Sequence, residues 1–157
     1  MSKCVFAGCF DPFTIGHLDV VKRLSAIFEE VFVVVSKNAG KKLVAEGNER
    51  FAMVKKAVDI GNVKVVLHEG LLVDFCVKNN VDCIVKGVRN LMDFEYESLQ
   101  ATVNNKLGKT ETLFLPCSDE LAFMSSSFVR EMLSLGRDIS AYVPSEILGD
   151  VIRLYRQ

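Results

Sequence analysis

The sequence predicts an α/β fold: a doubly wound, five-stranded parallel sheet within a three-layer αβα sandwich, closed by C-terminal helices. Five short apolar runs rich in β-branched residues recur along the chain, as expected for strands that are buried on both faces. Segments with helical periodicity lie between these runs, so strand and helix alternate. Strands joined by helical crossovers are parallel, and such crossovers are right-handed. Ligands bind such sheets at the carboxyl ends of the strands.

The elements follow in order along the chain. Strands are expected at residues 3–7, 31–35, 63–67, 83–85 and 112–115. Apolar side chains at helical spacing predict the helices between them, in three groups: Val20, Val21, Leu24, Ile27 and Phe28; Phe51, Val54 and Val58; Leu99, Val103 and Leu107. Two further helices are expected over residues 128–135 and 144–155, the second with Pro144 in its first turn. Residues 71–75 are interpreted as core packing with some apolar contact to a ligand. The whole pattern is Rossmann-like.

Composition excludes several classes of protein. The chain has 157 residues, half of them hydrophobic, with 19 Lys and Arg against 20 Asp and Glu. A chain of this length and composition is expected to form one soluble domain over residues 1–157 rather than a disordered segment. The formal net charge of −1 supplies none of the excess positive charge typical of proteins that bind nucleic acid or anionic membranes. A small, locally charged ligand site is compatible with this balance.

The cysteines indicate a reducing compartment. There are five, an odd number, and none forms a C-x-x-C pair. This pattern favours free thiols in a cytoplasmic protein over a disulfide framework. His17 and His68 lie near no cysteine pair, so no structural zinc or other protein metal site is expected. We also identify no secretion signal and no membrane-spanning segment.

Several common catalytic motifs are missing. The first predicted strand is not followed by G-x-G-x-x-G, because its glycines, Gly8 and Gly16, are too far apart. Residues 108–110, Gly-Lys-Thr, resemble the end of a P-loop, but they lead into a strand rather than a helix. There is no G-x-S-x-G elbow. Dinucleotide-dependent, P-loop and serine hydrolase chemistry are therefore not favoured.

Thr14-x-Gly16-His17 lies where the first strand gives way to the first helix. The imidazole would then sit at the positive end of that helix, which is a site for an anion. Alone, a histidine at a helix start is more often simply exposed. Here Gly8 permits close approach of a ligand to the backbone, and Gly16 leaves room above the strand end.

Ser125, Ser126 and Ser127 precede another predicted helix, and Arg130 falls in its first turns. One serine is explained as an N-cap, whereas three hydroxyl groups also suit a triphosphate. Arg130 is unfavourable near the positive end of a helix unless an anion or a carboxylate compensates it.

Basic residues also follow two other strands. Lys86, Gly87 and Arg89 stand at the end of the fourth, and residues 38–42, with Lys41, follow the second. Alone, the first group is equally consistent with a solvated surface segment, and for residues 38–42 a surface loop is the stronger interpretation. Together, however, the loops after four strands supply His, Lys, Arg, Gly or Ser, and a parallel sheet brings such loops to one edge. The sequence therefore predicts a phosphate-binding site at that edge.

In these motifs, and over essentially its whole length, the chain resembles the phosphopantetheine adenylyltransferase family of the H-x-G-H nucleotidyltransferase superfamily. The resemblance rests on Gly8-x-Phe10-Asp11-Pro12, Thr14-x-Gly16-His17, Lys41, residues 71–75, Gly87-x-Arg89, residues 93–97, Ser125-Ser126-Ser127 and Val129-Arg130. It implies transfer of adenylate from ATP to phosphopantetheine, with release of pyrophosphate and formation of dephospho-coenzyme A. It further implies Mg²⁺ carried by ATP and a homohexamer in the bacterial cytoplasm.

The resemblance also assigns roles to residues. The catalytic residues it implies are His17, Lys41 and Arg89. The implied ATP-binding residues are Cys9, Phe10, His17, Gly87, Val88, Arg89, Glu97, Leu121, Ala122, Phe123, Met124, Ser125, Ser126 and Ser127. The implied phosphopantetheine-binding residues are Cys9, Lys41, Leu72 and Lys86. The chain departs from the family at Cys9, where Ser or Thr is usual, and at Lys86, where many relatives carry Arg, so a hydroxyl and a bidentate fork are lost.

The implied chemistry suits these residue types. The nucleophile is already a phosphate anion, so no side chain has to remove a proton, and catalysis consists of positioning and electrostatic stabilisation. Two alternatives stay open: a related adenylyl- or cytidylyltransferase that acts on another phosphorylated acceptor, and a nucleotide sensor without chemistry. Lys41 argues against the sensor, which needs no second cationic loop.

Overall fold

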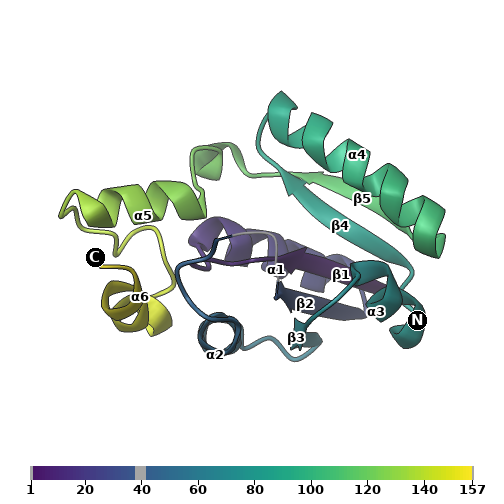
Figure 1. The fold of residues 1–157 in the computed structure, drawn as a ribbon, viewed down its shortest axis with the longest axis horizontal. Coiled ribbons are helices and arrows are strands. Elements are labelled where there is room, and N and C mark those ends of the chain that lie inside the picture. The colour runs from purple at the N-terminus through teal and green to yellow at the C-terminus, as the bar shows by residue number, and fades with distance from the viewer. Residues whose placement is uncertain (1, 38–41, 157) are drawn as a thin grey trace.

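The sheet has five strands, all parallel, in the order β3-β2-β1-β4-β5 (Figure 1). The structure, a computed structural model, describes residues 2–37 and 42–156. The strands are β1 Lys3–Gly8, β2 Glu30–Ser36, β3 Val63–His68, β4 Cys83–Val88 and β5 Glu111–Pro116. Each predicted strand is confirmed, with one to three residues added at its ends.

Six α-helices join and follow the strands within the described residues: α1 Ile15–Ile27, α2 Gly47–Ala57, α3 Leu72–Asn79, α4 Leu91–Gly108, α5 Ser126–Ser134 and α6 Leu148–Tyr155. Two short 3₁₀ turns, η1 Asp119–Leu121 and η2 Ser145–Ile147, precede α5 and α6. The last predicted helix therefore begins four residues later than expected, because Pro144 opens the 3₁₀ turn instead. Helices α5 and α6 lie at the end of the sheet away from the N-terminus (Figure 1).

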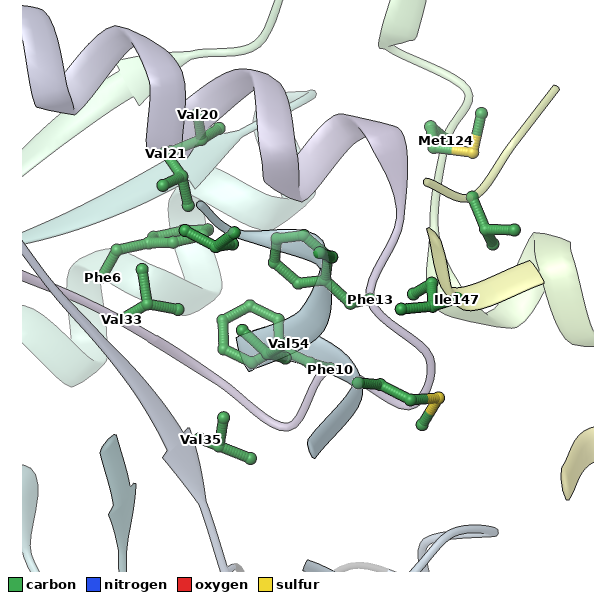
Figure 2. Close-up of a cluster of buried hydrophobic side chains, with 14 of the residues drawn as sticks. Phe6, Phe10, Phe13, Val20, Val21, Val33, Val35, Val54, Met124 and Ile147 are labelled. Carbon is green, nitrogen blue, oxygen red and sulfur yellow. The ribbon is translucent and has the colours of Figure 1, made fainter. Parts of the chain in front are cut away.

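Alternation along the strands builds two cores. On one face of the sheet, Phe6 and Val33 pack with apolar side chains of α1, α2, α5 and α6. On the other face, Val5 and Val34 pack against Phe75 of α3. Strand β2 is buried from residue 31 to residue 35, as expected for a strand covered on both sides. Figure 2 shows part of the first core, where side chains from strands, α1 and the C-terminal segment gather around aromatic rings.

The strand order alone indicates where a ligand site lies, without reference to any side chain. From β1 the chain moves outward to β2 and β3, and then returns to pair β4 with the other side of β1. The loops after β1 and β4 therefore leave the sheet in opposite directions. Such a switch point opens a crevice at the carboxyl ends of the two strands.

Helix α4 forms as predicted, but its apolar face is exposed. Leu99, Val103 and Leu107 are 65%, 42% and 60% exposed, and α4 contains no buried residue. Phe94 packs α4 against the sheet, because the centre of its ring lies 5.0 Å from that of Phe114 in β5. In the part of the chain that the structure describes, no helix is both long and apolar enough to cross a membrane.

Candidate active site

A cavity of about 490 Å³ opens at the switch point. Its walls come from the ends of β1 and β4, the starts of α1 and α5, the loop after β2 and one side of α4. This volume suits a small-molecule ligand. The predicted convergence of distant loops at one edge of the sheet is therefore observed for the loops that the structure describes.

The loop after β1 forms the floor of the cavity around Phe10. This residue adopts a left-handed backbone with φ of 51°, a conformation that costs a non-glycine residue about 1–3 kcal/mol. Its ring is 3% exposed and packs against Phe6 and Phe13, which offsets that strain. A Cβ at Gly8 would lie 3.0 Å from the Phe10 ring, so the absence of a side chain at Gly8 allows the ring to take this place.

His17 is fixed by a reciprocal cap at the start of α1. Its Nδ1 accepts a hydrogen bond from the backbone N–H of Thr14 at 3.0 Å, and its own N–H donates to the Thr14 hydroxyl. Because Nδ1 is an acceptor, the proton of the neutral ring lies on Nε2. His17 lines the cavity, and the Nε2–H group is the part of the ring that can donate a hydrogen bond there.

The surroundings keep this imidazole neutral. Phe6, Phe10 and Phe13 surround it with ring-centre distances of 6.4, 5.0 and 5.4 Å. Burial, with a smaller contribution from the charge of Arg89, lowers the pKa of His17 from 6.5 to about 4. At neutral pH the residue is a hydrogen-bond donor without charge, held in one orientation.

Two ion pairs line the wall formed by β4 and α4. Lys86 lies 3.2 Å from a carboxylate oxygen of Glu97. Arg89 donates from Nε and Nη2 to the two carboxylate oxygens of Asp93, and from Nη1 to the Met124 carbonyl at 3.0 Å. Asp93 therefore holds the guanidinium in a fork, and Arg89 ties the end of β4 to the segment before α5.

The N-terminus of α5 forms another wall of the cavity. The Ser125 hydroxyl caps the helix by accepting from the N–H of Phe128, and the Ser126 hydroxyl donates to the Pro12 carbonyl. The N–H groups of Ser126 and Ser127 belong to the first turn, where no acceptor within the helix exists. These groups are suited to an anion.

Arg130 adds a cation to the same wall. Its guanidinium donates to the Asp11 carbonyl and to the Ser127 hydroxyl. Among the described residues, no ion pair joins it to a carboxylate. Arg130 also lines the cavity, where its charge is suited to an anion.

Most of the predicted site residues that are described line this cavity. They are Cys9, Phe10, His17, Lys86, Gly87, Arg89, Glu97, Leu121, Met124, Ser125, Ser126 and Ser127. Val88, Ala122 and Phe123 do not line it, and Phe123 is 55% exposed. Leu72 lies instead against the second core, next to α3 residues such as Phe75. The predicted Lys41 lies outside the described residues, while its neighbours Lys42 and Leu43 line the cavity.

Several lining residues were absent from the predicted set. They include Asp11, Lys42, Asp93, Cys117 and Arg130. Asp93 and Arg130 belong to quoted motifs, and their charges gave a usable signal. Cys117 carries no charge, and its signal was only its position just after the fifth predicted strand.

The arrangement is suited to binding and stabilising phosphates. It combines an uncharged donor, cations on three sides and a helix N-terminus, which together can hold oxygens that gain negative charge. Within residues 2–37 and 42–156, no group of three or more His, Cys, Asp or Glu side chains is placed to hold a metal ion.

Comparison with known proteins agrees with this chemistry. The model of the cytidylyltransferase-like family matches residues 5–132. The chain is 42% identical over 149 residues to the phosphopantetheine adenylyltransferase of Streptomyces coelicolor, covering 94% of each chain. It is 43% identical over 152 residues to the enzyme of the same name from Finegoldia magna, covering 96% of this chain and 94% of that one.

The fold has a counterpart among solved structures. A putative nicotinate-nucleotide adenylyltransferase from Vibrio parahaemolyticus superposes with a TM-score of 0.67, covering 97% of this chain and 99% of the other. The two sequences are 18% identical, so this likeness concerns the fold alone.

Proposed function

The chain belongs to the cytidylyltransferase-like family and, within it, to the phosphopantetheine adenylyltransferases, and from this membership we propose that its cavity transfers adenylate from ATP to phosphopantetheine. The products are dephospho-coenzyme A and pyrophosphate, so the protein is an adenylyltransferase of coenzyme A biosynthesis. The observation that carries the proposal is the neutral, oriented His17 in a cavity lined by cations and by the start of α5.

The reaction needs no general base. An oxygen of the acceptor phosphate attacks the α-phosphorus of ATP, the bond from that phosphorus to the bridging oxygen breaks, and pyrophosphate leaves. Nδ1 of His17 is occupied by the N–H of Thr14 and cannot take a proton from the acceptor. Its Nε2–H is available to donate to the transferred phosphoryl group as negative charge gathers there.

ATP and the acceptor have different sides of the cavity in this proposal. Arg89, Glu97 and the start of α5 form the ATP side, as the resemblance implies, with Cys9, Phe10 and Gly87 beside them. Lys86 and the loop after β2, which brings Lys42 to the cavity, form the acceptor side, and Lys41 is proposed as its main cation. The His17 imidazole stands at the start of α1, between the two sides.

Mg²⁺ is proposed to arrive with ATP. Two carboxylates line this part of the cavity, those of Asp93 and Glu97, and each is paired with a cation. Among the described residues, no group of three or more His, Cys, Asp or Glu side chains could hold a metal ion. These residues therefore fit an ion whose ligands come mainly from the triphosphate and water. When bound, Mg²⁺ neutralises phosphate charge.

We also propose that the protein is a homohexamer of the cytoplasm. The exposed apolar face of α4 supports assembly, because an apolar face of this kind is typical of a surface that meets another chain. All five cysteines are free, which supports a reducing compartment.

The direct test is an acceptor panel. Purified protein is incubated with ATP and Mg²⁺ together with phosphopantetheine, nicotinic acid mononucleotide or no acceptor, and pyrophosphate release is followed. We expect release with phosphopantetheine alone. Release with the mononucleotide instead would identify a different adenylyltransferase, and ATP binding without release in any mixture would identify a nucleotide sensor.

A further inference from the structure

A buried polar network lies beneath the acceptor side of the cavity, and the reaction described above does not use it. Asp11 and Arg50 are the charged residues at its centre, 5% and 2% exposed. Burial of charged groups is costly unless they are satisfied by specific partners. The partners of these two side chains are mainly backbone groups of the loops that line the cavity.

The peptide groups of Ala45 are held from both sides. Ala45 N–H donates to one carboxylate oxygen of Asp11 at 3.1 Å, and the N–H of Val44 donates to the other at 2.9 Å. On its other side, the Ala45 carbonyl accepts from Nε of Arg50 at 3.0 Å. This segment follows directly on Lys42 and Leu43, which line the cavity, so the two buried charges fix the position of the backbone next to these residues.

Arg50 also ties this loop to the strand ends. Its Nη1 donates to the carbonyl of Cys9, just after β1, at 2.6 Å, and to the carbonyl of Ser36, the last residue of β2, at 2.9 Å. One guanidinium on α2 therefore joins the ends of β1 and β2 to the loop. The planar fork of arginine makes these contacts possible, whereas the single ammonium of lysine has no such geometry.

The third member of the network comes from the last helix. The Tyr155 hydroxyl donates to Asp11 at 2.6 Å, across 144 positions of sequence. Burial and the neighbouring Asp11 raise the pKa of Tyr155, so the hydroxyl keeps its proton and remains a donor. Tyr155 is itself 5% exposed. The final turn of α6 thus supports the same carboxylate that holds the loop.

We infer that Asp11, Arg50 and Tyr155 are positioning residues that hold residues 42–45 of the loop after β2 in place beside the cavity and so determine affinity for the phosphorylated acceptor. The inference rests on the proposed function, because it assigns this loop to the acceptor side. The ATP side is built mainly from β4, α4 and α5 and has its own hydrogen bonds through Asp93 and Ser125. It meets the network at the backbone carbonyls of Cys9 and Asp11, whereas Val44 and Ala45 are held by the Asp11 carboxylate. Loosening the network should therefore act on one substrate more than on the other.

The test is Tyr155→Phe, which removes one hydroxyl and leaves the ring in place. We expect the KM for phosphopantetheine to rise about 3–10-fold, as for the net loss of one typical hydrogen bond, with the KM for ATP and kcat within about twofold of wild type. Saturating phosphopantetheine should restore the wild-type rate. Tyr96→Phe, on the exposed side of α4, is the matched control and should change neither KM.

A second variant keeps the inference testable whatever the stability of the first. Arg50→Lys retains the charge but loses the fork, and it should raise the same KM by at least as much as Tyr155→Phe. Equal rises in both KM values, or a lower Tm with both KM values unchanged, would overturn the inference and leave a structural role only. Wild-type turnover is measured alongside: its absence would refute the proposed function, whereas its presence with an unchanged acceptor KM in both variants refutes only the inference.

Discussion

At the scale of single residues, His17 shows how the fold prepares a side chain for its task. The cap at Thr14 fixes the ring through Nδ1, and three phenylalanine rings pack around it. Both effects favour the uncharged ring with its proton on Nε2, since a buried imidazolium is poorly solvated. A donor held in place before reaction loses little energy in reorganisation as charge develops.

Replacing His17 with Ala should lower kcat by about 10²–10³, the usual effect of removing one oriented donor to a developing oxyanion. The measurement is steady-state pyrophosphate release, with circular dichroism to verify that the variant is folded. His68→Ala is the matched control, because the ring of His68 lies at the end of β3 and contacts Phe75, away from the cavity. Wild-type turnover by a folded His17→Ala protein would refute the assigned role.

The lowered pKa of His17 also predicts how stability depends on pH. The unfolded chain binds a proton at this residue below about pH 6.5, while the folded protein does so only near pH 4. Folding is therefore opposed by protonation in this window, and the stabilisation is present above pH 6.5 and lost as the pH falls toward 4. Urea unfolding should show a loss on the order of 2 kcal/mol between these limits that His17→Gln does not share. Parallel curves for the two proteins would contradict the assignment.

At the scale of elements, the sequence predicts those strands and helix ends that are determined by neighbouring residues. The strands were predicted to within three residues because each is a β-branched run covered on both faces, as residues 31–35 of β2 show. The site motifs at His17 and Ser125 were found because capping residues and strand ends have local signatures. Leu72 packs against the second core, as predicted for residues 71–75, and its contact with the acceptor stays a prediction.

Contacts between distant positions were not predictable in this way. Asp11 contacts residues 33, 34 and 144 positions away, and no local pattern in the sequence relates these positions to one another. Helix α4 shows the same limit, because periodicity identifies an apolar face without telling whether the chain's own core or a second chain covers it.

The exposed face of α4 leads to a prediction about assembly. Leu99→Glu places a charge in the middle of that face and should convert the proposed hexamer to smaller species without unfolding the subunit, since the side chain is 65% exposed. Sedimentation velocity measures the change. Ile27→Glu, at a similarly exposed position at the end of α1, is the matched control and should leave the assembly unchanged. An unaltered sedimentation coefficient for Leu99→Glu would place the interface elsewhere.

At the scale of the whole molecule, the strand order explains why one cavity serves two anionic substrates. Because the chain leaves β1 in one direction and returns beside it as β4, loops far apart in sequence meet above these two strands. Local cations at this edge coexist with a net charge of −1 for the chain, so the overall charge balance does not reveal the site. Both reactants can then be held at once, and phosphate can attack phosphorus directly.

Direct transfer has a stereochemical signature, and measuring it tests the central claim. The enzyme is given ATP with a chiral sulfur substitution at the α-phosphorus together with phosphopantetheine, and the configuration of the product is determined by ³¹P NMR. A single in-line displacement between two substrates held together predicts inversion at that phosphorus. Retention would indicate an adenylated protein side chain as intermediate and would contradict the account of His17 as a neutral donor in a site without a protein nucleophile.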